Sequence, residues 1–176
     1  PILAIAALLI RVTSEGPVLF RQRRIGLRGI EFTMVKFRTM TVGVDATSLA
    51  NRKDPRITGV GTWLRATALD ELPQLLNVLR GEMSVIGPRP ALPEMVPHYR
   101  EDEAKRMEVK PGLTGWAQVN GRNSLAYHDR LQLDLWYARH WSIWLDFLIL
   151  AKTIPALINR RGLYQDEPRP RERRTT

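Results

Sequence analysis

Two adjacent carboxylates, Asp70 and Glu71, are the side chains of this sequence best suited to chemistry. A carboxylate can act as a nucleophile toward phosphorus, and it can also bind a divalent cation. Adjacent acids at the start of a helix commonly do no more than complement the helix dipole. Here a chemical role is favoured because fixed cations lie before and after them in the chain: Lys36, Arg38, Arg65, Arg89, Lys110 and Arg122. Acids among basic loops suit a phosphorylated substrate, since the cations hold phosphate oxygens while the acids react or bind a metal ion.

The segment that carries the acids, residues 69–90, is predicted to be a short amphipathic helix followed by a stiff loop. Leucines recur in it at offsets of three and four, the spacing of a buried helical stripe: Leu69, Leu72, Leu75, Leu76 and Leu79. The helix would begin at a Thr67 cap, with Asp70 as its capping-box partner, and would stop at Gly81. Arg89 would then lie on the rigid Gly-Pro-Arg-Pro that follows.

The first cations lie on a predicted β-hairpin. Residues 18–22 and 31–37 are typical of short strands, and a basic, glycine-bearing turn separates them. Lys36 and Arg38 would share one face of the second strand, because side chains alternate along a strand. A polar loop is expected over residues 42–54.

Several further segments complete the predicted fold. Residues 99–107 and 124–137 are typical of helices, while 110–123 form a glycine-rich loop with an Asn-Gly turn signal. Residues 141–161 are strongly apolar, and Pro155 is expected to kink them. The sequence therefore predicts an α/β fold of the helix-dominated α+β type, with one small hairpin and several short and amphipathic helices.

The composition narrows the class of partner. A chain of 176 residues suffices for one domain with its own core. The formal net charge of +9 and the pI near 10.6 indicate an anionic partner: nucleic acid, anionic lipid head groups or phosphorylated small molecules. Since the sequence contains no cysteine, a disulfide scaffold, a thiolate zinc site and a cysteine nucleophile are excluded. The three histidines do not have the spacing of metal ligands.

Apolar segments at both ends of the chain suggest contact with a membrane. Residues 1–10 are apolar but too short to span a bilayer core of about 30 Å. Near the other end, tryptophans and an arginine pair resemble the anchors found at a membrane interface: Trp136, Trp141, Trp144 and Arg160-Arg161. We therefore expect a chain that lies on or dips into a membrane. The alternative is that both segments belong to a large internal core.

Three stretches, in this order and spacing, resemble the bacterial sugar transferase family: VKFRTM (35–40), DPRITGVGTWLRATALDELPQLLNVLRGEMSVIGPRP (54–90) and KPGLTGWAQVNGRN (110–123). These are monotopic polyprenyl-phosphate phosphoglycosyl transferases, and the resemblance covers about residues 1–163. It implies transfer of a sugar-1-phosphate from a UDP-sugar to polyprenyl phosphate, usually undecaprenyl phosphate, with release of UMP. Such a reaction begins the synthesis of bacterial glycans such as O-antigen or exopolysaccharide. The resemblance implies an enzyme of the inner membrane whose catalytic domain is on the cytoplasmic face.

The resemblance also implies residue roles. Asp70 is expected to attack the sugar-bearing phosphoryl group and form a covalent phosphosugar-enzyme, and Glu71 to assist as a metal neighbour or general base. The family requires Mg²⁺, for which Asp70 is the expected ligand. Arg89 is expected to contact a phosphate, and four other cations are further candidates for that role: Lys36, Arg38, Arg65 and Arg122.

The same resemblance divides the chain into three parts. Residues 1–12 would be the returning half of a re-entrant membrane helix, 13–165 the catalytic domain, and 166–176 a disordered basic tail. Residues 88–100 resemble the short forms of the family that use N-acetylated amino sugars. The sequence does not show which UDP-sugar is used, nor the oligomeric state.

Two other interpretations remain open. A basic nucleic-acid-binding module fits the charge, but no helix-turn-helix, zinc or RNA-recognition motif is present, so no nucleic acid partner is expected. A non-catalytic membrane scaffold fits the apolar ends, but the presence of Asp70, Glu71 and Arg89 argues against it.

Overall fold

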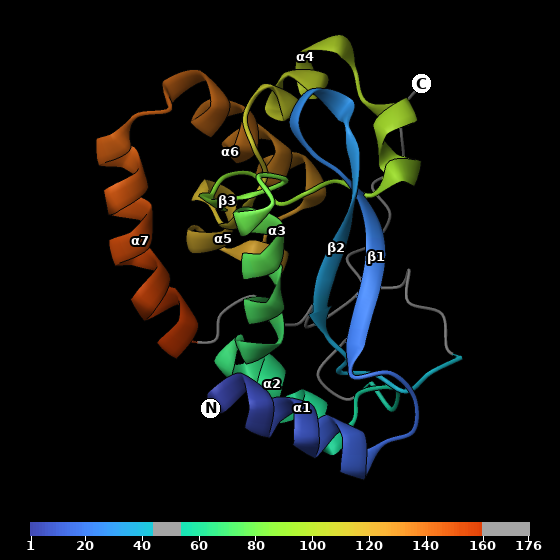
Figure 1. Ribbon diagram of the computed structural model, residues 1–176. Helices are drawn as coiled ribbons and strands as arrows, with labels where there is room; N and C mark the ends of the chain where they lie inside the picture. Colours follow the sequence, from blue (N-terminus) through green and yellow to red (C-terminus); the bar gives the residue numbers. More distant parts are fainter. Residues whose placement is uncertain (44–53, 160–176) are drawn as a thin grey trace.

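The computed structural model describes residues 1–43 and 54–159 (Figure 1). At its centre is an antiparallel hairpin of strands β1 (Leu19–Ile25) and β2 (Glu31–Phe37), joined through the short helix η1 (Leu27–Gly29). The predicted hairpin is confirmed, and its first strand is longer than expected. Most of the predicted polar loop, the arginine pair and the predicted basic tail lie outside the described residues.

Helices α1 (Ile2–Thr13) and α2 (Gly59–Thr67) pack at one end of the hairpin. They bury a small apolar cluster of Ala6, Ile10, Phe37 and Leu64. Thr58 caps α2, because its hydroxyl accepts a hydrogen bond of 2.9 Å from the Gly61 backbone N–H. A Cβ on Gly61 would lie 2.1 Å from the Thr39 carbonyl oxygen, so only glycine allows α2 to approach the end of β2 this closely.

The acid-bearing segment is a 3₁₀ turn followed by a short α-helix, rather than one amphipathic helix. The two parts are η2 (Leu69–Gln74) and α3 (Leu75–Leu79). The predicted Thr67 cap is wrong: Thr67 is the last residue of α2, and its hydroxyl donates to the Trp63 carbonyl (3.0 Å). Ala68, in the left-handed region at φ 56°, separates α2 from η2. Gly81 ends the segment at φ 77°, as the sequence predicted.

The predicted buried leucine stripe is only partly present: Leu69 packs against the cluster beneath α1 and α2, and Leu72 is half-buried, but the stripe does not continue into α3. Leu75, Leu76 and Leu79 are exposed, and Leu79 keeps 83% of its surface. The buried face carries polar side chains instead, Asp70, Gln74 and Asn77. The break between η2 and α3 changes the helical repeat, so offsets of three and four do not keep the leucines on one face.

Asn77 explains why a polar face can be buried here. Its side chain is 0% exposed and lies along the free edge of β2, where Oδ1 accepts from the Val35 N–H (3.1 Å). Its Nδ2 donates to the Thr33 carbonyl (2.8 Å) and to the Glu82 carboxylate (2.6 Å). The amide therefore takes the place of a neighbouring strand and fixes α3 against the hairpin.

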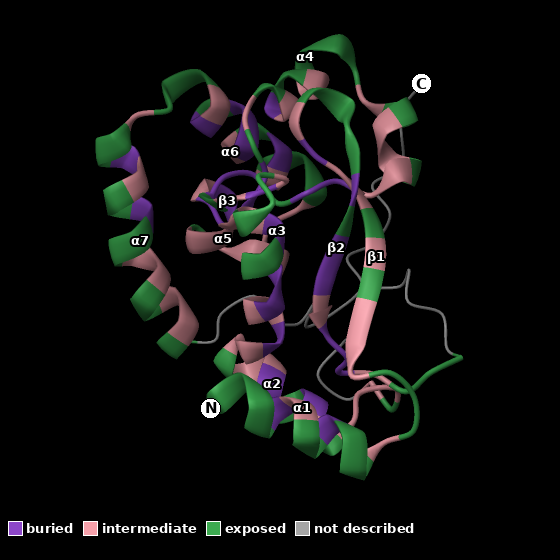
Figure 2. Cartoon of the chain, viewed as in Figure 1, coloured by how far each residue is buried: buried purple, intermediate pink, exposed green. Residues whose placement is uncertain are grey.

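The other end of the molecule collects the C-terminal elements. Strand β3 (Ser84–Ile86) pairs in parallel with β4 (Gly112–Thr114). Around them lie α5 (Trp116–Val119), α6 (Tyr127–His140) and α7 (Ile143–Ile158), which bury Ile86, Tyr137, Leu145 and Ile149. Figure 2 shows buried residues along β2 and α6 and exposed ones over the outer side of α7.

Short helical turns connect these elements. They are η3 (Pro93–His98), α4 (Glu101–Ala104), η4 (Lys105–Glu108) and η5 (Arg122–Ser124). The helix predicted over 99–107 thus appears as α4 and η4, and the one predicted over 124–137 begins slightly later, as α6. Pro155 lies inside α7. Among the described residues, no helix has the length and apolar character needed to cross a membrane.

Candidate active site

The two acids meet the hairpin and the Gly-Pro-Arg-Pro loop at one place. Asp70 and Glu71 lie in the first turn of η2, which packs against β2. Asp70 is 8% exposed. The Arg89 guanidinium reaches back from its loop, and its Nη2 donates to Glu71 Oε1 at 2.9 Å. The predicted grouping of both acids with Arg89 is therefore present in the fold.

The surroundings shift the pKa values of the two carboxylates in opposite directions. Burial raises the pKa of Asp70 to about 6, and the neighbouring Glu71 charge adds to this, while Lys36, Arg65 and Arg89 oppose it. Burial would raise the pKa of Glu71 as well, but the charge and hydrogen bond of Arg89 outweigh it and hold that pKa below its usual value. Two adjacent acids thus acquire different chemical characters.

The two carboxylates also differ in their hydrogen bonds. Glu71 is committed to Arg89, whereas the Asp70 carboxylate accepts no side-chain hydrogen bond from the described residues. A buried carboxylate with free lone pairs is the better nucleophile or metal ligand of the two, because nothing has to be displaced from it.

Lys36 is the cation on the hairpin that faces the acids. Its ammonium lies 5.2 Å from the Phe20 ring centroid. Burial and the nearby Arg89 charge lower the pKa of Lys36 to about 8, although Asp70 and Glu71 pull it upward. Lys36 is therefore still mostly protonated at neutral pH, and the charges of Asp70 and Glu71 compensate its positive charge only in part.

Arg65 and Arg122 complete the cluster from two other directions. Arg65, on α2, donates from Nε to the Thr39 hydroxyl (2.8 Å), and its charge lowers the pKa of Asp70. Arg122, on η5, has its own pKa lowered by burial, with Glu71 and Asp70 acting in the opposite direction. Four of the five predicted phosphate ligands thus gather around the acids: Lys36, Arg65, Arg89 and Arg122.

The fifth predicted phosphate ligand, Arg38, does not join them. Its side chain is buried, with Nε donating to the Pro17 carbonyl (2.6 Å) and Nη2 to the Ser14 carbonyl (3.1 Å). Strand β2 ends at Phe37, so Arg38 lies outside the strand and the alternation of side chains no longer puts it on the same face as Lys36. Arg38 instead fixes the turn between α1 and β1.

The Gly-Pro-Arg-Pro loop is held by the distant glycine-rich motif. The Gly87 N–H donates to the Thr114 carbonyl and the Gly112 N–H to the Pro88 carbonyl, both at 2.9 Å. A Cβ on Gly87 would lie 2.2 Å from the Lys110 carbonyl oxygen. Glycine is therefore required for the two segments to come together, and this contact places Arg89 over the acids.

Asp70 is the residue best placed to hold a divalent metal ion. Among residues 1–43 and 54–159, no cluster of three or more His, Cys, Asp or Glu side chains has metal-binding geometry. Mg²⁺ does not need such a cluster, since it is commonly held by one or two carboxylates together with substrate phosphates and water. The open lone pairs of Asp70 fit that mode, and those of Glu71, paired with Arg89, fit it less well.

Comparison with known proteins identifies the family. The model of the family described as bacterial sugar transferase matches residues 1–160. The chain belongs to the bacterial sugar transferase family. Every residue of the acid and cation cluster lies within the matched region of that family. The resemblance predicted from the three motifs is thereby confirmed.

Individual relatives agree with this assignment. The uncharacterized sugar transferase EpsL of Bacillus subtilis (strain 168) is 45% identical over 157 residues, which are 89% of this chain and 78% of EpsL. An undecaprenyl-phosphate glucose phosphotransferase of Komagataeibacter xylinus is 45% identical over 178 residues, 93% of this chain and 34% of that protein. A UDP-glucose:undecaprenyl-phosphate glucose-1-phosphate transferase of Caulobacter vibrioides is 43% identical, over 93% of this chain and 65% of that protein. The chain thus spans about a third of some relatives and most of others.

Sequence reasoning missed two residues that support this candidate site. Asn77 holds the acid-bearing segment to β2, and Arg24 donates from Nη1 to the Pro90 carbonyl at 3.0 Å. A signal for Asn77 was present, since a polar residue between Leu76 and Val78 interrupts an apolar run. Nothing local to Arg24 indicates its partner, which lies 66 residues away.

Proposed function

We propose that this chain catalyses the transfer of a sugar-1-phosphate from a UDP-sugar to undecaprenyl phosphate, with release of UMP. One observation carries the proposal: a buried aspartate with free lone pairs lies beside a glutamate held by Arg89, within a ring of cations. The printed names of the relatives from Komagataeibacter xylinus and Caulobacter vibrioides support the substrate class. The transferred and accepting groups are both phosphates, which suits the four gathered cations.

In the first step, an Asp70 carboxylate oxygen attacks the phosphorus that bears the sugar. The bond from that phosphorus to the oxygen bridging toward uridine breaks, and UMP leaves with the bonding electron pair. Arg89 and Lys36 offset the charge on the transferring phosphoryl group, which is usually the largest contribution to such reactions. A bound Mg²⁺ would supply further charge stabilisation and hold the diphosphate, with Asp70 as its protein ligand.

In the second step, an oxygen of the lipid phosphate attacks the same phosphorus. The bond to Asp70 breaks, which regenerates the carboxylate and gives the sugar diphosphate-linked lipid. Glu71 remains anionic throughout, because Arg89 keeps its pKa low, and it orients Arg89 rather than donating a proton. One nucleophile thus serves a soluble and a lipid substrate in turn.

The apolar surface of the molecule suits a membrane-bound acceptor. Large apolar side chains are exposed on α1 and α7: Ile2, Ile5, Leu8, Val12, Trp144, Phe147, Ile154 and Ile158. In α1 they follow helical spacing opposite the buried Ala6 and Ile10. We propose that these faces rest on the cytoplasmic side of the bacterial inner membrane, with α1 as part of the expected re-entrant helix.

UMP formation across a panel of UDP-sugars, with undecaprenyl phosphate and Mg²⁺ present, tests the proposed reaction. The panel should include glucose and galactose, named in relatives, and N-acetylated amino sugars, which residues 88–100 favour. Asp70→Asn should abolish UMP formation, whereas the same change at exposed Asp129 should leave it unaltered. An Asp70→Asn variant that releases UMP at the normal rate would overturn the nucleophile assignment.

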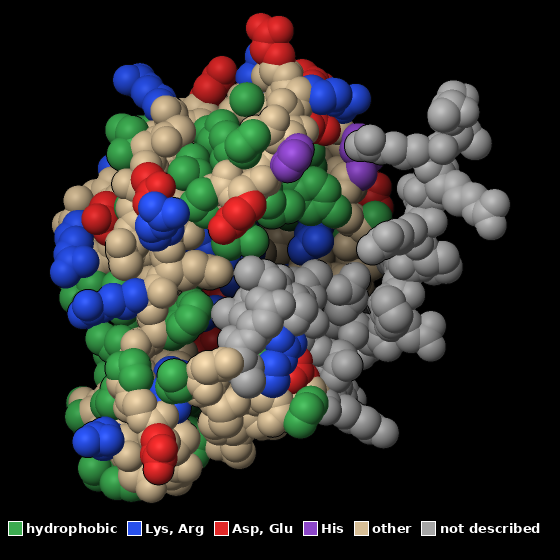
Figure 3. Space-filling view, turned by 90° about the vertical axis from the view of Figure 1, so that its right-hand side faces the viewer, with side chains coloured by type: hydrophobic (Ala, Val, Ile, Leu, Met, Phe, Trp, Pro, Cys, Tyr) green, Lys and Arg blue, Asp and Glu red, His purple; other side chains and the backbone are tan. Residues whose placement is uncertain are grey.

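The nucleic-acid alternative gains no support from the face of the molecule shown in Figure 3. On that face, Lys and Arg side chains are scattered over the molecule rather than gathered in one stripe. The scaffold alternative makes a different prediction from ours, namely that the chain is inert toward every UDP-sugar of the panel.

A further inference from the structure

We propose that Arg106 and Asp134 are positioning residues for Arg89: Arg106 donates to the Arg89 backbone carbonyl oxygen, and Asp134 holds the Arg106 guanidinium. The inference rests on the proposed function, in that Arg89 is taken to contact the transferring phosphate. Arg106 lies on η4 and Asp134 on α6, and neither belongs to the acid and cation cluster.

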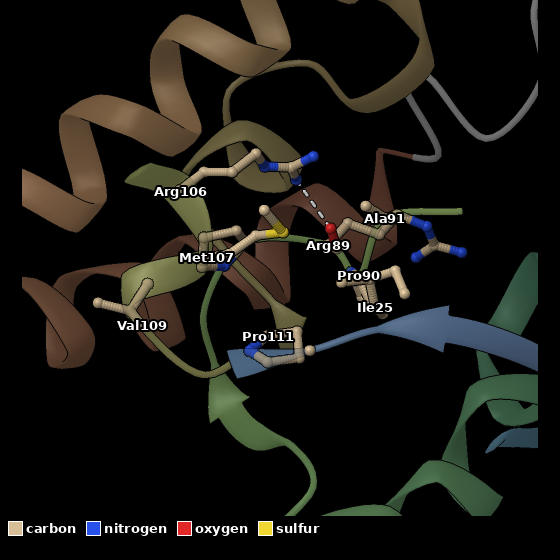
Figure 4. A pocket seen from close by; sticks show the side chains of 10 residues that line it. Ile25, Arg89, Pro90, Ala91, Arg106, Met107, Val109 and Pro111 are labelled. Atoms are coloured by element: carbon tan, nitrogen blue, oxygen red, sulfur yellow. Dashed lines mark hydrogen bonds between the residues drawn. The ribbon is translucent and has the colours of Figure 1, made fainter. Parts of the chain in front are cut away.

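The contact is direct. Arg106 Nη2 donates to the Arg89 carbonyl oxygen at 2.8 Å, and the same nitrogen donates to Asp134 Oδ2. Arg106 Nη1 donates to the Tyr99 hydroxyl at 2.9 Å. Figure 4 shows Arg106 pointing at that carbonyl while the Arg89 side chain extends to the opposite side. The main chain of Arg89 is thus held on one side so that its guanidinium reaches Glu71 on the other.

The rest of the loop is held in the same manner. Each carbonyl from Pro88 to Ala91 accepts a hydrogen bond: Pro88 from the Gly112 N–H (2.9 Å), Pro90 from Arg24 Nη1 (3.0 Å) and Ala91 from the Ile25 N–H (2.9 Å). Two prolines flank Arg89 and supply no N–H, so the loop has few donors of its own. Its position is therefore set mainly by donors from other elements, and Arg106 is the donor at Arg89 itself.

Stability alone does not account for a buried ion pair at this place. Arg106 is 7% and Asp134 is 4% exposed, and removing two charges from water costs much of what their attraction returns. Apolar side chains of similar volume commonly stabilise a core as well or better. They cannot donate to the Arg89 carbonyl, however, and this is the contact that an arginine supplies.

The test is a double-mutant cycle between Arg106 and Arg89, read as kcat/KM for UMP formation. Arg106→Lys keeps the charge beside Asp134, but a single ammonium cannot replace the fork that joins Asp134, Tyr99 and the Arg89 carbonyl. We expect Arg106→Lys to lower kcat/KM about tenfold in the wild-type background and less than twofold in Arg89→Met. Equal losses in both backgrounds would overturn the inference, because they would show that Arg106 acts without the Arg89 side chain.

A matched core variant separates positioning from loss of stability. Leu131→Ala removes a buried side chain from α6, one turn before Asp134, and that side chain has no group that could donate a hydrogen bond to the loop carbonyls. It should lower the melting temperature at least as much as Arg106→Lys while keeping kcat/KM within about twofold of wild type. If Leu131→Ala instead reproduces the tenfold loss, the effect of Arg106 is structural.

A second variant covers the case in which Arg106→Lys folds poorly. Asp134→Asn keeps the shape of the side chain but weakens its hold on Arg106, and it should lower kcat/KM severalfold with the same dependence on Arg89. An unchanged value would contradict the inference. A wild-type protein inactive on the whole panel would contradict the proposed function instead, so the two failures are distinguishable.

Discussion

The acid-bearing segment and the Gly-Pro-Arg-Pro loop meet at the ion pair of Glu71 with Arg89, yet they are held in opposite ways. In the acid-bearing segment, the side chain of Asn77 forms hydrogen bonds with the backbone of β2. The loop instead contributes backbone carbonyls, which accept hydrogen bonds from side chains of other elements, such as Arg24 and Arg106. A change at Asn77 should therefore affect mainly stability, while changes at the residues that hold the loop should affect catalysis more strongly.

Among the variants that separate these two segments, removal of the Arg89 guanidinium should have the largest effect, and that effect is on the rate of UMP formation. Arg89→Met should lower UMP formation about 10²- to 10³-fold, because it removes the positive charge proposed to contact the transferring phosphoryl group and leaves Glu71 without its partner. Initial rates at saturating UDP-sugar measure this. The same substitution at Arg23, an exposed arginine of β1, should change the rate less than twofold. Equal losses at both positions would show that Arg89 has no special place in the reaction.

Loss of the Asn77 hydrogen bonds should have the next largest effect, and that effect is on the free energy of unfolding rather than on the reaction rate. Asn77→Leu keeps the volume but leaves the buried Val35 N–H unpaired, so the free energy of unfolding should fall by about 2–3 kcal/mol. Chemical denaturation in detergent measures the loss. Asn120→Leu, at an exposed position, should cost far less. A stable Asn77→Leu protein would show that packing alone holds α3 to β2.

The raised pKa of Asp70 predicts that this carboxylate, the proposed nucleophile, lowers the stability of the folded protein. Because burial raises that pKa to about 6, the ionised carboxylate disfavours the folded state above pH 6, and the cost fades as the pH falls toward the usual aspartate value. In metal-free protein, Asp70→Asn should therefore raise the free energy of unfolding by about 1–3 kcal/mol at pH 7.5. The gain should be smaller at pH 5. A gain that grows on acidification would contradict the raised pKa.

The exposed leucines of α3 should give the smallest effect. Leu79→Ser should change the free energy of unfolding by about 0.5 kcal/mol or less, because the side chain buries little surface. Leu64→Ala, in the cluster beneath α1 and α2, should cost about 2–5 kcal/mol. Thermal melts of the two variants at the same pH compare them. A large loss at Leu79 would restore the buried stripe that the sequence predicted.

Local patterns in the sequence predicted the parts of the molecule that depend on local physics. The alternation of side chains predicted the hairpin, and Gly81 predicted the stop that directly follows α3. The acid pair and four of its five predicted cations do lie together, Arg89 and Arg122 on segments rich in glycine or proline, Lys36 on β2 and Arg65 on α2. The leucine stripe does not continue into α3 because a 3₁₀ turn replaces the first part of the helix, and Arg38 does not join the other cations because β2 ends at Phe37.

The contacts that position the loop could not be read from the sequence. Two partners of Arg106, the Arg89 carbonyl and Asp134, are 17 and 28 residues away, and the Pro90 carbonyl that Arg24 contacts is 66 residues away. No spacing rule connects such pairs, since each depends on how η4, α6 and β1 pack around the loop. The separate pKa values of Asp70 and Glu71 likewise follow from burial and from Arg89, not from their adjacent positions.

The most direct test of the central claim is the intact mass of the protein after it is mixed with UDP-sugar and Mg²⁺ in the absence of undecaprenyl phosphate. An activated Asp70 nucleophile predicts one equivalent of UMP and a mass increase of one sugar phosphate, located by peptide fragmentation at Asp70 and absent from Asp70→Asn. Adding the lipid phosphate should remove the added mass. A protein that releases UMP only when the lipid is present and never gains mass, or gains it at another residue, would contradict the account.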